Sequence, residues 1–414
     1  MQKSLEMMDQ SGSNSYLIDE ALWEKINERA SGSANLCFQC GECTAVCPWG
    51  IVKEGSLKVR SILRGAQLGV EDWDKEIWLC TNCIQCQSYC PRGVQIGDIF
   101  QALRSLSWEN REVEPGLPSM LWSIYWNDNP WSQPPSERFN WARGANIPEF
   151  DCQEHEFLLY IGCTSAFDNR LQKVAQALAR VLTAFGVSFG CLGVNEPCCG
   201  ESIKSVGHNP YFRETAESTA RIFTSAGVRK LMTLSPHCYD VFKNHYRTVL
   251  QEESFEVFHY TQVLAELLEN GKVSIPAGFI DRALENNYSW IDPDGVTITF
   301  QDPCYLGRRN NEFQAPRTLI LGIPGINLIE MENHMQDGLC CGGGGGRMWL
   351  ETPSGERFSD IRIKQALETG ASILATACPF CLVCLEDSLN ALGKKNLFVL
   401  DIAEIVDMAI GQSG

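Results

Sequence analysis

The 414-residue sequence has no apolar run that reaches the eighteen or so residues of a membrane-spanning helix. Its first residues, M-Q-K-S-L-E-M-M-D, lack the apolar stretch of a secretory signal peptide. Basic charge is also scarce, since 34 Lys and Arg stand against 51 Asp and Glu, for a net charge of −17. Nucleic-acid binding needs a basic surface, so the charge argues against it. We expect a cytoplasmic protein whose only route to a membrane is a partner subunit.

Twenty cysteines are too few, for this length, to form a dense disulfide scaffold. Structural disulfides also belong to oxidising compartments, which the N-terminal sequence does not indicate. The cysteines instead fall in tight clusters with the spacing of metal ligands. We therefore interpret most of them as metal-binding thiols.

Two runs near the N-terminus share the spacing C-x2-C-x2-C-x3-C-P. The first contains Cys37, Cys40, Cys43 and Cys47, and the second contains Cys80, Cys83, Cys86 and Cys90. This run, present twice, is the signature of bacterial two-cluster ferredoxins, in which the fourth cysteine of each run ligates the other cluster. We predict two cubane 4Fe–4S clusters, one on Cys37, Cys40, Cys43 and Cys90, the other on Cys80, Cys83, Cys86 and Cys47. Zinc on C-x-x-C pairs is the weaker alternative.

A different cysteine set lies in the last third of the chain. Its members are Cys304, the vicinal pair Cys340 and Cys341, and the C-P-F-C pair Cys378 and Cys381. Zinc takes four ligands, and one short loop cannot easily aim two adjacent thiolates at a single ion. A multi-iron cluster can accept adjacent thiolates on different irons. The set therefore predicts an iron–sulfur site.

The same set occurs earlier in the chain with one change. Cys163 lies 141 residues before Cys304, Cys198-Cys199 lies 142 before Cys340-Cys341, and Cys238 lies 143 before Cys381. Self-similarity at a fixed offset indicates an internal duplication. Ser235 stands where the second copy has Cys378, and a serine hydroxyl is a much poorer iron ligand than a thiolate.

The tandem pattern C…C-C-G…C-P-x-C resembles the cysteine-rich CCG repeat of heterodisulfide reductase. Three longer segments of the second repeat are also similar to that family: D-P-C-Y-L-G-R, C-C-G-G-G-G-G-R-M-W and T-A-C-P-F-C-L. The family includes the B and D subunits of that enzyme and iron–sulfur subunits of glycolate, lactate and glycerol-3-phosphate oxidising complexes. The resemblance implies that a complete repeat holds a non-cubane 4Fe–4S cluster on five cysteines. It implies one such cluster on the Cys304 set, and a second only if the first set accepts Ser235. In heterodisulfide reductase two such clusters split a disulfide by successive one-electron steps.

The expected fold is α/β with an all-α part, in four segments. Residues 1–112 form a helical ferredoxin module, 113–152 a connector rich in Trp and Pro, 153–290 the first CCG domain, and 291–414 the second. Apolar periodicity predicts module helices over about Tyr16–Arg29, Leu57–Leu68 and Gly97–Trp108. The spacer between the cysteine runs is long, and the module resembles the helical ferredoxins of succinate dehydrogenases.

Strands alternating with helices predict a parallel sheet in each CCG domain. Strands are expected at Phe157–Ile161, Lys230–Leu234, Val296–Phe300 and Ile373–Ala377, each followed by a cysteine loop, with a helix at Leu171–Phe185. Ligands of open α/β sheets lie beyond the carboxyl ends of the strands. Two facing halves would bring both cysteine sets to one cleft.

Five tryptophans lie in the connector or just before it: Trp108, Trp122, Trp126, Trp131 and Trp141. An aromatic belt at a membrane surface is one interpretation, but the segment lacks the Lys/Arg face that such helices carry. We expect the indoles to pack between the modules.

The five-glycine run after Cys341 lacks Cβ atoms, so Gly342, Gly343 and Gly344 can approach a cofactor closely. Ser235 is the further candidate cofactor contact. A mobile loop is the alternative for the glycines. The run does not follow a strand as a dinucleotide fingerprint does, so no flavin or nucleotide site is evident.

Candidate catalytic residues are His237, as a proton donor to a thiolate product, and Arg308, Arg309 and Arg347. The arginines could bind an anionic substrate or only offset the charge of the thiolates. A structural role is the alternative for His237. Three cysteines have no counterpart in the repeat and are expected to be core residues: Cys152, Cys191 and Cys384. Of these, Cys384 is the first candidate for a role other than packing.

The resemblance implies an oxidoreductase component similar to the D subunit of heterodisulfide reductase, which passes electrons between the cubanes and the CCG-bound clusters. It implies flavin-containing partner subunits and a small disulfide as a potential substrate. Because exposed clusters are damaged by oxygen, we also expect an anaerobic or microaerobic source. The alternatives are a relay subunit of a flavin-linked 2-hydroxy-acid or glycerol-3-phosphate dehydrogenase, and an electron-supply subunit for a low-potential reductase such as benzoyl-CoA reductase.

Overall fold

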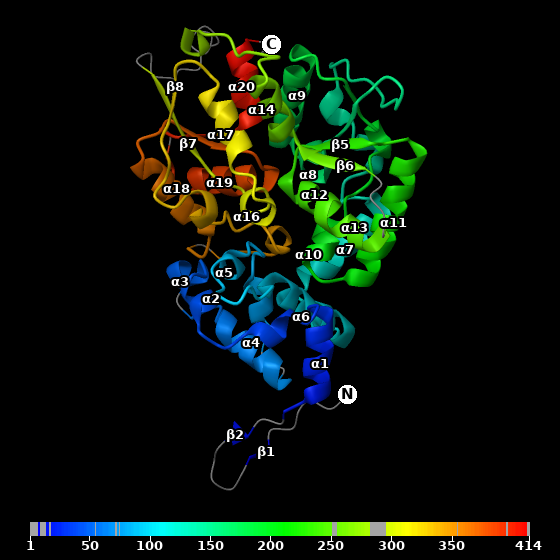
Figure 1. The fold of residues 1–414 in the computed structure, drawn as a ribbon, viewed down its shortest axis with the longest axis vertical. Coiled ribbons are helices and arrows are strands. Elements are labelled where there is room, and N and C mark those ends of the chain that lie inside the picture. The colour runs from blue at the N-terminus through cyan, green and yellow to red at the C-terminus, as the bar shows by residue number, and fades with distance from the viewer. Residues whose placement is uncertain are drawn as a thin grey trace.

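The computed structural model describes residues 7–8, 14–15, 18–53, 55–70, 73, 75–250, 255–281, 295–353, 355–394 and 396–411. A helical module lies at one end of the molecule, and two α/β halves lie side by side above it (Figure 1). The expected boundary at 290 and 291 and the start of the expected helix at Tyr16 fall outside the described residues. No helix in the described ranges is long and apolar enough to cross a membrane.

The N-terminal module consists of short helices around the two cysteine runs. They are α1 (Glu20–Arg29), α2 (Glu42–Ala45), α3 (Trp49–Val52), α4 (Val59–Leu68), α5 (Gln85–Ser88) and α6 (Ile96–Asn110), preceded by the two-residue strands β1 (Met7–Met8) and β2 (Asn14–Ser15). Helix α4 buries Val59, Ile62, Leu63 and Ala66, the i, i+3, i+4, i+7 pattern of an amphipathic helix. The Asp19 carboxylate caps α1 by accepting from the Leu22 amide at 3.0 Å. The expected helical ferredoxin module is confirmed.

Each α/β half contains a four-stranded parallel sheet. The first has β3 (Phe157–Tyr160), β4 (Phe189–Gly190), β5 (Lys230–Thr233) and β6 (Glu256–His259), in the order β4-β3-β5-β6. The second has β7 (Val296–Phe300), β8 (Ile326–Leu328), β9 (Ile373–Thr376) and β10 (Phe398–Asp401), in the order β10-β9-β7-β8. All pairings within both sheets are parallel. The two orders are equivalent, so the duplication seen in the cysteines is confirmed at the level of the sheets.

Helices surround both sheets, as the alternating pattern predicts. Helix α7 (Gly116–Asn127) belongs to the connector. The first half contains α8 (Cys163–Phe167), α9 (Asn169–Ala184), α10 (Glu201–Ser205), α11 (Asn209–Ser225), α12 (Pro236–Asp240), α13 (Tyr246–Leu250) and α14 (Tyr260–Glu269). The second contains α16 (Gly307–Asn310), α17 (Gln314–Leu321), α18 (Phe358–Glu368), α19 (Pro379–Ala391) and α20 (Ile402–Ile410).

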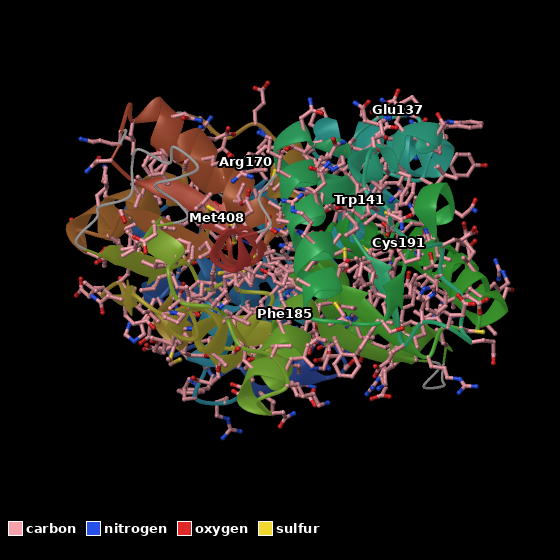
Figure 2. The ribbon with its side chains drawn as sticks, turned by 90° about the horizontal axis from the view of Figure 1, so that it is seen from above. Glu137, Trp141, Arg170, Phe185, Cys191 and Met408 are labelled. Atoms are coloured by element: carbon pink, nitrogen blue, oxygen red, sulfur yellow. The ribbon has the colours of Figure 1, made fainter. Side chains whose placement is uncertain are left out.

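The two halves share one hydrophobic core, which runs from Trp141 in the connector to Ala409 in α20. Helix α9 lies beside α20, with Arg170 and Met408 at the junction in Figure 2. The Arg170 guanidinium bridges the halves by pairing with Glu386 and Glu404, each at 2.7 Å. Partly buried ion pairs and a common core make the halves one packed body.

The connector tryptophans divide into two groups. Trp141 is buried, the Trp131 ring lies 4.9 Å from that of Trp349, and the Trp108 indole donates to the Val206 carbonyl at 2.8 Å. These three pack between modules, as expected. Trp122 and Trp126 are 61% and 72% exposed. The expectation is wrong for these two, because α7 turns that face toward the surface.

Candidate metal centres

One cavity of the helical module is lined by four of the predicted ligands. Cys37, Cys40 and Cys43 of the first run share it with Cys90 of the second, and Arg60 and Arg92 also line it. The cysteines converge because each run bends through a short helix, α2 or α5, and these two helices pack together. The fourth cysteine of one run thus lies with the first three of the other.

The second group in this module is more deeply buried. The Cys83 and Cys80 thiols act electrostatically on Cys47 more strongly than Cys43 of the first run does, and Cys80, Cys83 and Cys47 likewise act on Cys86 more strongly than Cys43 does, which groups the four together. Burial raises the pKa of Cys47 to about 12 and that of Cys43 to about 11. Ligating cysteines must be thiolates, so these thiols need a bound metal to ionise at neutral pH. Each set fits a 4Fe–4S cluster, which takes four cysteine thiolates.

Cys47→Ser should damage the cluster assigned to Cys80, Cys83 and Cys86, although Cys47 belongs to the other run. The reason is that Cys47 lies among the thiols of the second run. Electron paramagnetic resonance (EPR) of the two reduced cubanes would show which signal is lost. Cys152→Ser, at an exposed thiol, is the control and should leave both signals unchanged. Loss of the signal assigned to Cys37, Cys40 and Cys43 would contradict the crossed assignment.

The cysteines of the α/β halves lie beyond the carboxyl ends of the two central strands of each sheet. Cys163 begins α8 after β3, and Ser235 precedes α12 after β5. In the second half, Cys304 follows β7 and Cys378 precedes α19 after β9. Neighbouring parallel strands end at the same edge, which is where open α/β sheets place ligands.

The thiols within each half repeat the same contacts. The Sγ atoms of Cys199 and Cys238 are 3.4 Å apart, and those of the equivalent Cys341 and Cys381 are also 3.4 Å apart. Cys304 and Cys340 approach to 4.0 Å. All nine thiols of the two sets are buried. The Cys304 set has the five-thiol composition implied for a non-cubane cluster.

Ser235 differs from Cys378 in what its side chain does. The Ser235 hydroxyl accepts a hydrogen bond from the His237 amide at 3.3 Å, which caps α12. Cys378 makes no cap bond to α19. The serine therefore fulfils a local structural role and also lines the small cavity beside Cys163, Cys198, Cys199 and Cys238.

His237 lies between the two cysteine sets. Its ring stacks on Tyr305 at 3.8 Å and lies 4.5 Å from Phe380, both of the second half. Burial lowers the pKa of His237, but the Glu201 carboxylate and a hydrogen bond with Cys378 outweigh it and raise the pKa to about 10. The histidine thus acts on a predicted ligand of the second set, although it follows Ser235 of the first. These stacked rings lie between the two sets, which were expected to face one cleft.

The connector supplies a basic residue to the first cysteine set that the sequence did not reveal. The buried Arg138 guanidinium lies 3.5 and 3.6 Å from Cys163 Sγ through its two terminal nitrogens, and 3.4 Å from Glu196. Glu196 in turn accepts from the amides of Ile161 and Gly162 at 2.9 and 3.0 Å. A guanidinium beside a thiolate favours the charged form. Arg138 lies outside the repeat, so no motif pointed to it.

The second cysteine set touches the helical module directly. The buried thiols of Cys83 and Cys340 lie close enough that each shifts the pKa of the other. A Cβ atom on Gly344 would lie 2.4 Å from the Thr81 carbonyl oxygen, and one on Gly345 2.3 Å from that of Cys80. No side chain fits at either position. The glycine run therefore permits contact with the cysteine loop of the helical module, while the Gly342 amide donates to Cys340 Sγ at 3.3 Å.

Two of the candidate arginines stabilise the contact between the second α/β half and the helical module. Arg308 donates to the Cys83 carbonyl at 2.9 Å, and Arg309 donates to the Asn82 carbonyl at 3.0 Å. Arg309 also covers the Tyr305 ring at 4.5 Å. Arg347 differs, since it lies over Trp49 and lines a cavity of about 440 Å³ that reaches Cys341. The first two arginines thus have structural partners that the sequence interpretation did not foresee.

The three remaining cysteines have separate environments. Cys384 is partly buried and lines the cavity that reaches Cys341, while Cys191 is in the core and Cys152 is exposed. Within the described part of the chain, no group of three or more His, Cys, Asp or Glu is arranged to hold a single metal ion. The four sets offer thiols alone, the donors of iron–sulfur clusters.

Comparison with known proteins agrees with this arrangement. The chain matches the cysteine-rich domain (CCG) over residues 157–243 and 298–386, and the 4Fe-4S dicluster domain over residues 33–94. It is 30% identical over 410 residues to the D subunit of the dihydromethanophenazine:CoB–CoM heterodisulfide reductase of Methanosarcina barkeri, covering 91% of this chain and 94% of that one. A hypothetical protein of Helicobacter pylori has a similar fold, with a TM-score of 0.52, 12% identity and coverage of 96% of this chain and 74% of the other.

Two relatives are considerably longer than this chain. It is 35% identical over 347 residues to the probable iron-sulfur-binding oxidoreductase FadF of Bacillus subtilis, and 35% identical over the same length to the EtfAB:quinone oxidoreductase of Syntrophomonas wolfei. These alignments cover 81% and 80% of this chain but 47% and 46% of the relatives. The chain thus spans about half the length of these two proteins.

A helical dicluster module followed by two CCG domains defines an iron–sulfur oxidoreductase of the electron-transfer class. Within this class, the chain belongs to the family of the heterodisulfide reductase D subunits.

Proposed function

We propose that this chain is the electron-transfer subunit of a larger redox complex and connects the two ferredoxin-type centres with the Cys304 centre. The observation that carries this proposal is the direct contact between the second cysteine run and the second α/β half, where Arg308 donates to the Cys83 carbonyl at 2.9 Å and the glycine run lies against the carbonyls of Cys80 and Thr81. Iron–sulfur clusters on these thiolates supply one-electron transfer. The assigned ligands are Cys37, Cys40, Cys43 and Cys90; Cys80, Cys83, Cys86 and Cys47; and Cys304, Cys340, Cys341, Cys378 and Cys381.

The protein residues support this role by holding the centres in one rigid unit, in which every predicted ligand except Cys40 is buried or partly buried. Arg104 is buried and donates to the carbonyls of Cys80 and Ser205, at 2.7 and 2.6 Å, so it ties the second cysteine run to the first half. Arg308 ties that run to the second half. Fixed donors and a dry environment are among the features by which a protein sets cluster potentials.

Disulfide reduction by this chain is a second candidate, favoured by the family and by the cavity of the first set. That cavity is lined by Cys163, Cys198, Cys199 and Cys238, with Pro379 and Phe380 of the second half. Two features argue against this candidate. Ser235 stands in place of the fifth cysteine of the first set, and the rings of His237, Tyr305 and Phe380 lie between the two sets. We propose the relay role first, with a flavin-containing partner subunit on one side. A relative named as a quinone oxidoreductase is consistent with a quinone on the other.

Anaerobic reconstitution should yield roughly twelve irons per chain, four for each of three clusters, with matching sulfide. The reconstituted chain should oxidise a reduced viologen with a quinone as acceptor, and not with the CoB–CoM heterodisulfide. Plasma emission analysis of iron and zinc, with sulfide determination, tests the first part. Zinc in place of iron, or less than about eight irons after full reconstitution, would refute the cluster assignment. Brisk heterodisulfide reduction by the isolated chain would favour the second candidate.

A further inference from the structure

The predicted centre on Cys37, Cys40, Cys43 and Cys90 is the one that reaches the surface. Of the seventeen predicted ligand cysteines, Cys40 alone is exposed, and the others are buried or partly buried. The Cys83 end of the helical module is covered by the second α/β half. Electrons that enter or leave this chain through its helical module therefore have their shortest route at the Cys40 loop.

The surface around Cys40 carries apolar side chains that no described part of the chain covers. Phe38, between the ligands Cys37 and Cys40, is 60% exposed, and Leu36 is 43% exposed. Pro91 lines the same cavity and is also exposed. Aromatic side chains at the centre of a patch, next to polar residues, are typical of protein interfaces. Phe38 is in the position of such a central contact.

Basic residues border this patch although the chain as a whole carries a net charge of −17. Arg60 and Arg92 line the cavity and are exposed, with Glu42 as the acidic residue among its lining side chains. Arg64 follows Arg60 by one turn of α4, a helix with no acidic residue, and Lys58 precedes that helix. All four cationic side chains are exposed. Such a local reversal of charge steers a partner of opposite sign to one place.

We propose that the surface formed by Phe38, Cys40, Arg60, Arg64 and Arg92 docks a small acidic one-electron carrier protein of the ferredoxin or flavodoxin type. The inference rests on the proposed relay function and names its soluble partner. In the step itself, one electron leaves the reduced carrier, which is oxidised, and enters the chain at the Cys40 centre. No bond forms or breaks and no proton is required.

The test uses the reconstituted full chain and an acidic bacterial two-cluster ferredoxin as the probe. Arg60→Glu combined with Arg92→Glu should weaken binding at least tenfold at low ionic strength, and about 0.5 M salt should abolish the difference. The matched control is Arg213→Glu combined with Arg221→Glu, which makes the same charge change on exposed positions of α11 in the first half. It should change the Kd by less than about twofold, because surface charges far from an interface contribute little. Biolayer interferometry gives Kd and its salt dependence.

Phe38→Ala should weaken binding about tenfold without changing the salt dependence, since it removes contact area and no charge. Every variant should keep the iron content of the parent and should be reduced by dithionite, which needs no docking surface. Failure of dithionite to reduce the Cys304 centre in the parent chain would refute the relay itself. Equal binding by both double variants, or no binding of the ferredoxin, would overturn the docking proposal alone. Arginine-dependent binding to vesicles containing phosphatidylglycerol, without ferredoxin binding, would assign the surface to a membrane instead.

Discussion

Gly345→Ala should separate the Cys80 centre from the Cys304 centre. The new Cβ would lie 2.3 Å from the Cys80 carbonyl oxygen, so the loop or the helical module must move. Gly345 also has φ +63°, where an L side chain costs about 1–2 kcal/mol. Relieving the overlap should add about 1–3 kcal/mol. We expect a lower free energy of unfolding and slower electron exchange between the two centres, measured by chemical denaturation and by freeze-quench EPR.

Gly370→Ala is the matched control for backbone strain. Gly370 has φ +73°, and a Cβ there would meet no atom within 4 Å. This variant should lose about 1–2 kcal/mol and transfer electrons at the parent rate. If Gly345→Ala behaves like Gly370→Ala in both measurements, the close contact between the glycine run and the Cys80 loop does not couple the centres.

Cys341→Ser should abolish the EPR signal of the non-cubane cluster, whereas Cys199→Ser should leave it intact. Cys341 belongs to the set with five thiols, and Cys199 to the set in which Ser235 replaces the fifth. The two residues occupy equivalent places, each 3.4 Å from the last cysteine of its set. A redox titration of the reconstituted chain should therefore show one non-cubane signal, lost only with Cys341.

The two substitutions are matched in chemistry, burial and position. A difference between the EPR signals of the two variants therefore comes from the centre that each cysteine serves, and not from the type of substitution. Ser235→Cys provides the reverse test, because it restores the fifth thiol of the first set. This variant should gain a second non-cubane signal if Ser235 is what limits the site. Two equivalent signals in the parent chain would contradict the assignment and would favour disulfide chemistry between the halves.

Much of the fold could be predicted from local sequence patterns. The repeated cysteine runs, the offsets between Cys163 and Cys304 and between their partners, and the strands that precede them are periodic or spaced features. The two central strands of each sheet therefore appear where the apolar runs predict them, with ends that differ by at most one residue, whereas the outer strands β4, β6, β8 and β10 were not predicted. The grouping of Cys90 with Cys37 follows from a known signature.

The contacts between modules could not be predicted from local sequence patterns. Arg138 beside Cys163, and His237 beside Cys378, join residues that no repeat or spacing relates. Gly345 belongs to the glycine run that was expected to approach a cofactor closely, but its contact with the Cys80 loop depends on where that loop lies. Such tertiary partners are set by packing, which leaves no periodic trace in the sequence. The exposed indole rings of α7 are a further case, since periodicity cannot say which face a neighbouring module covers.

The interface between the two α/β halves affects how a small molecule can reach the space between their cysteine sets. Domains separated by small polar interfaces generally rotate about a hinge. Here a common core, the Arg170 ion pairs and the bond from the Tyr260 hydroxyl to Asp401 at 2.6 Å oppose such a rotation. The small cavity of the first set, which Phe380 of the second half lines, therefore keeps its walls in place. The two halves thus behave as one block, and a hinge motion between them is not expected to widen that cavity.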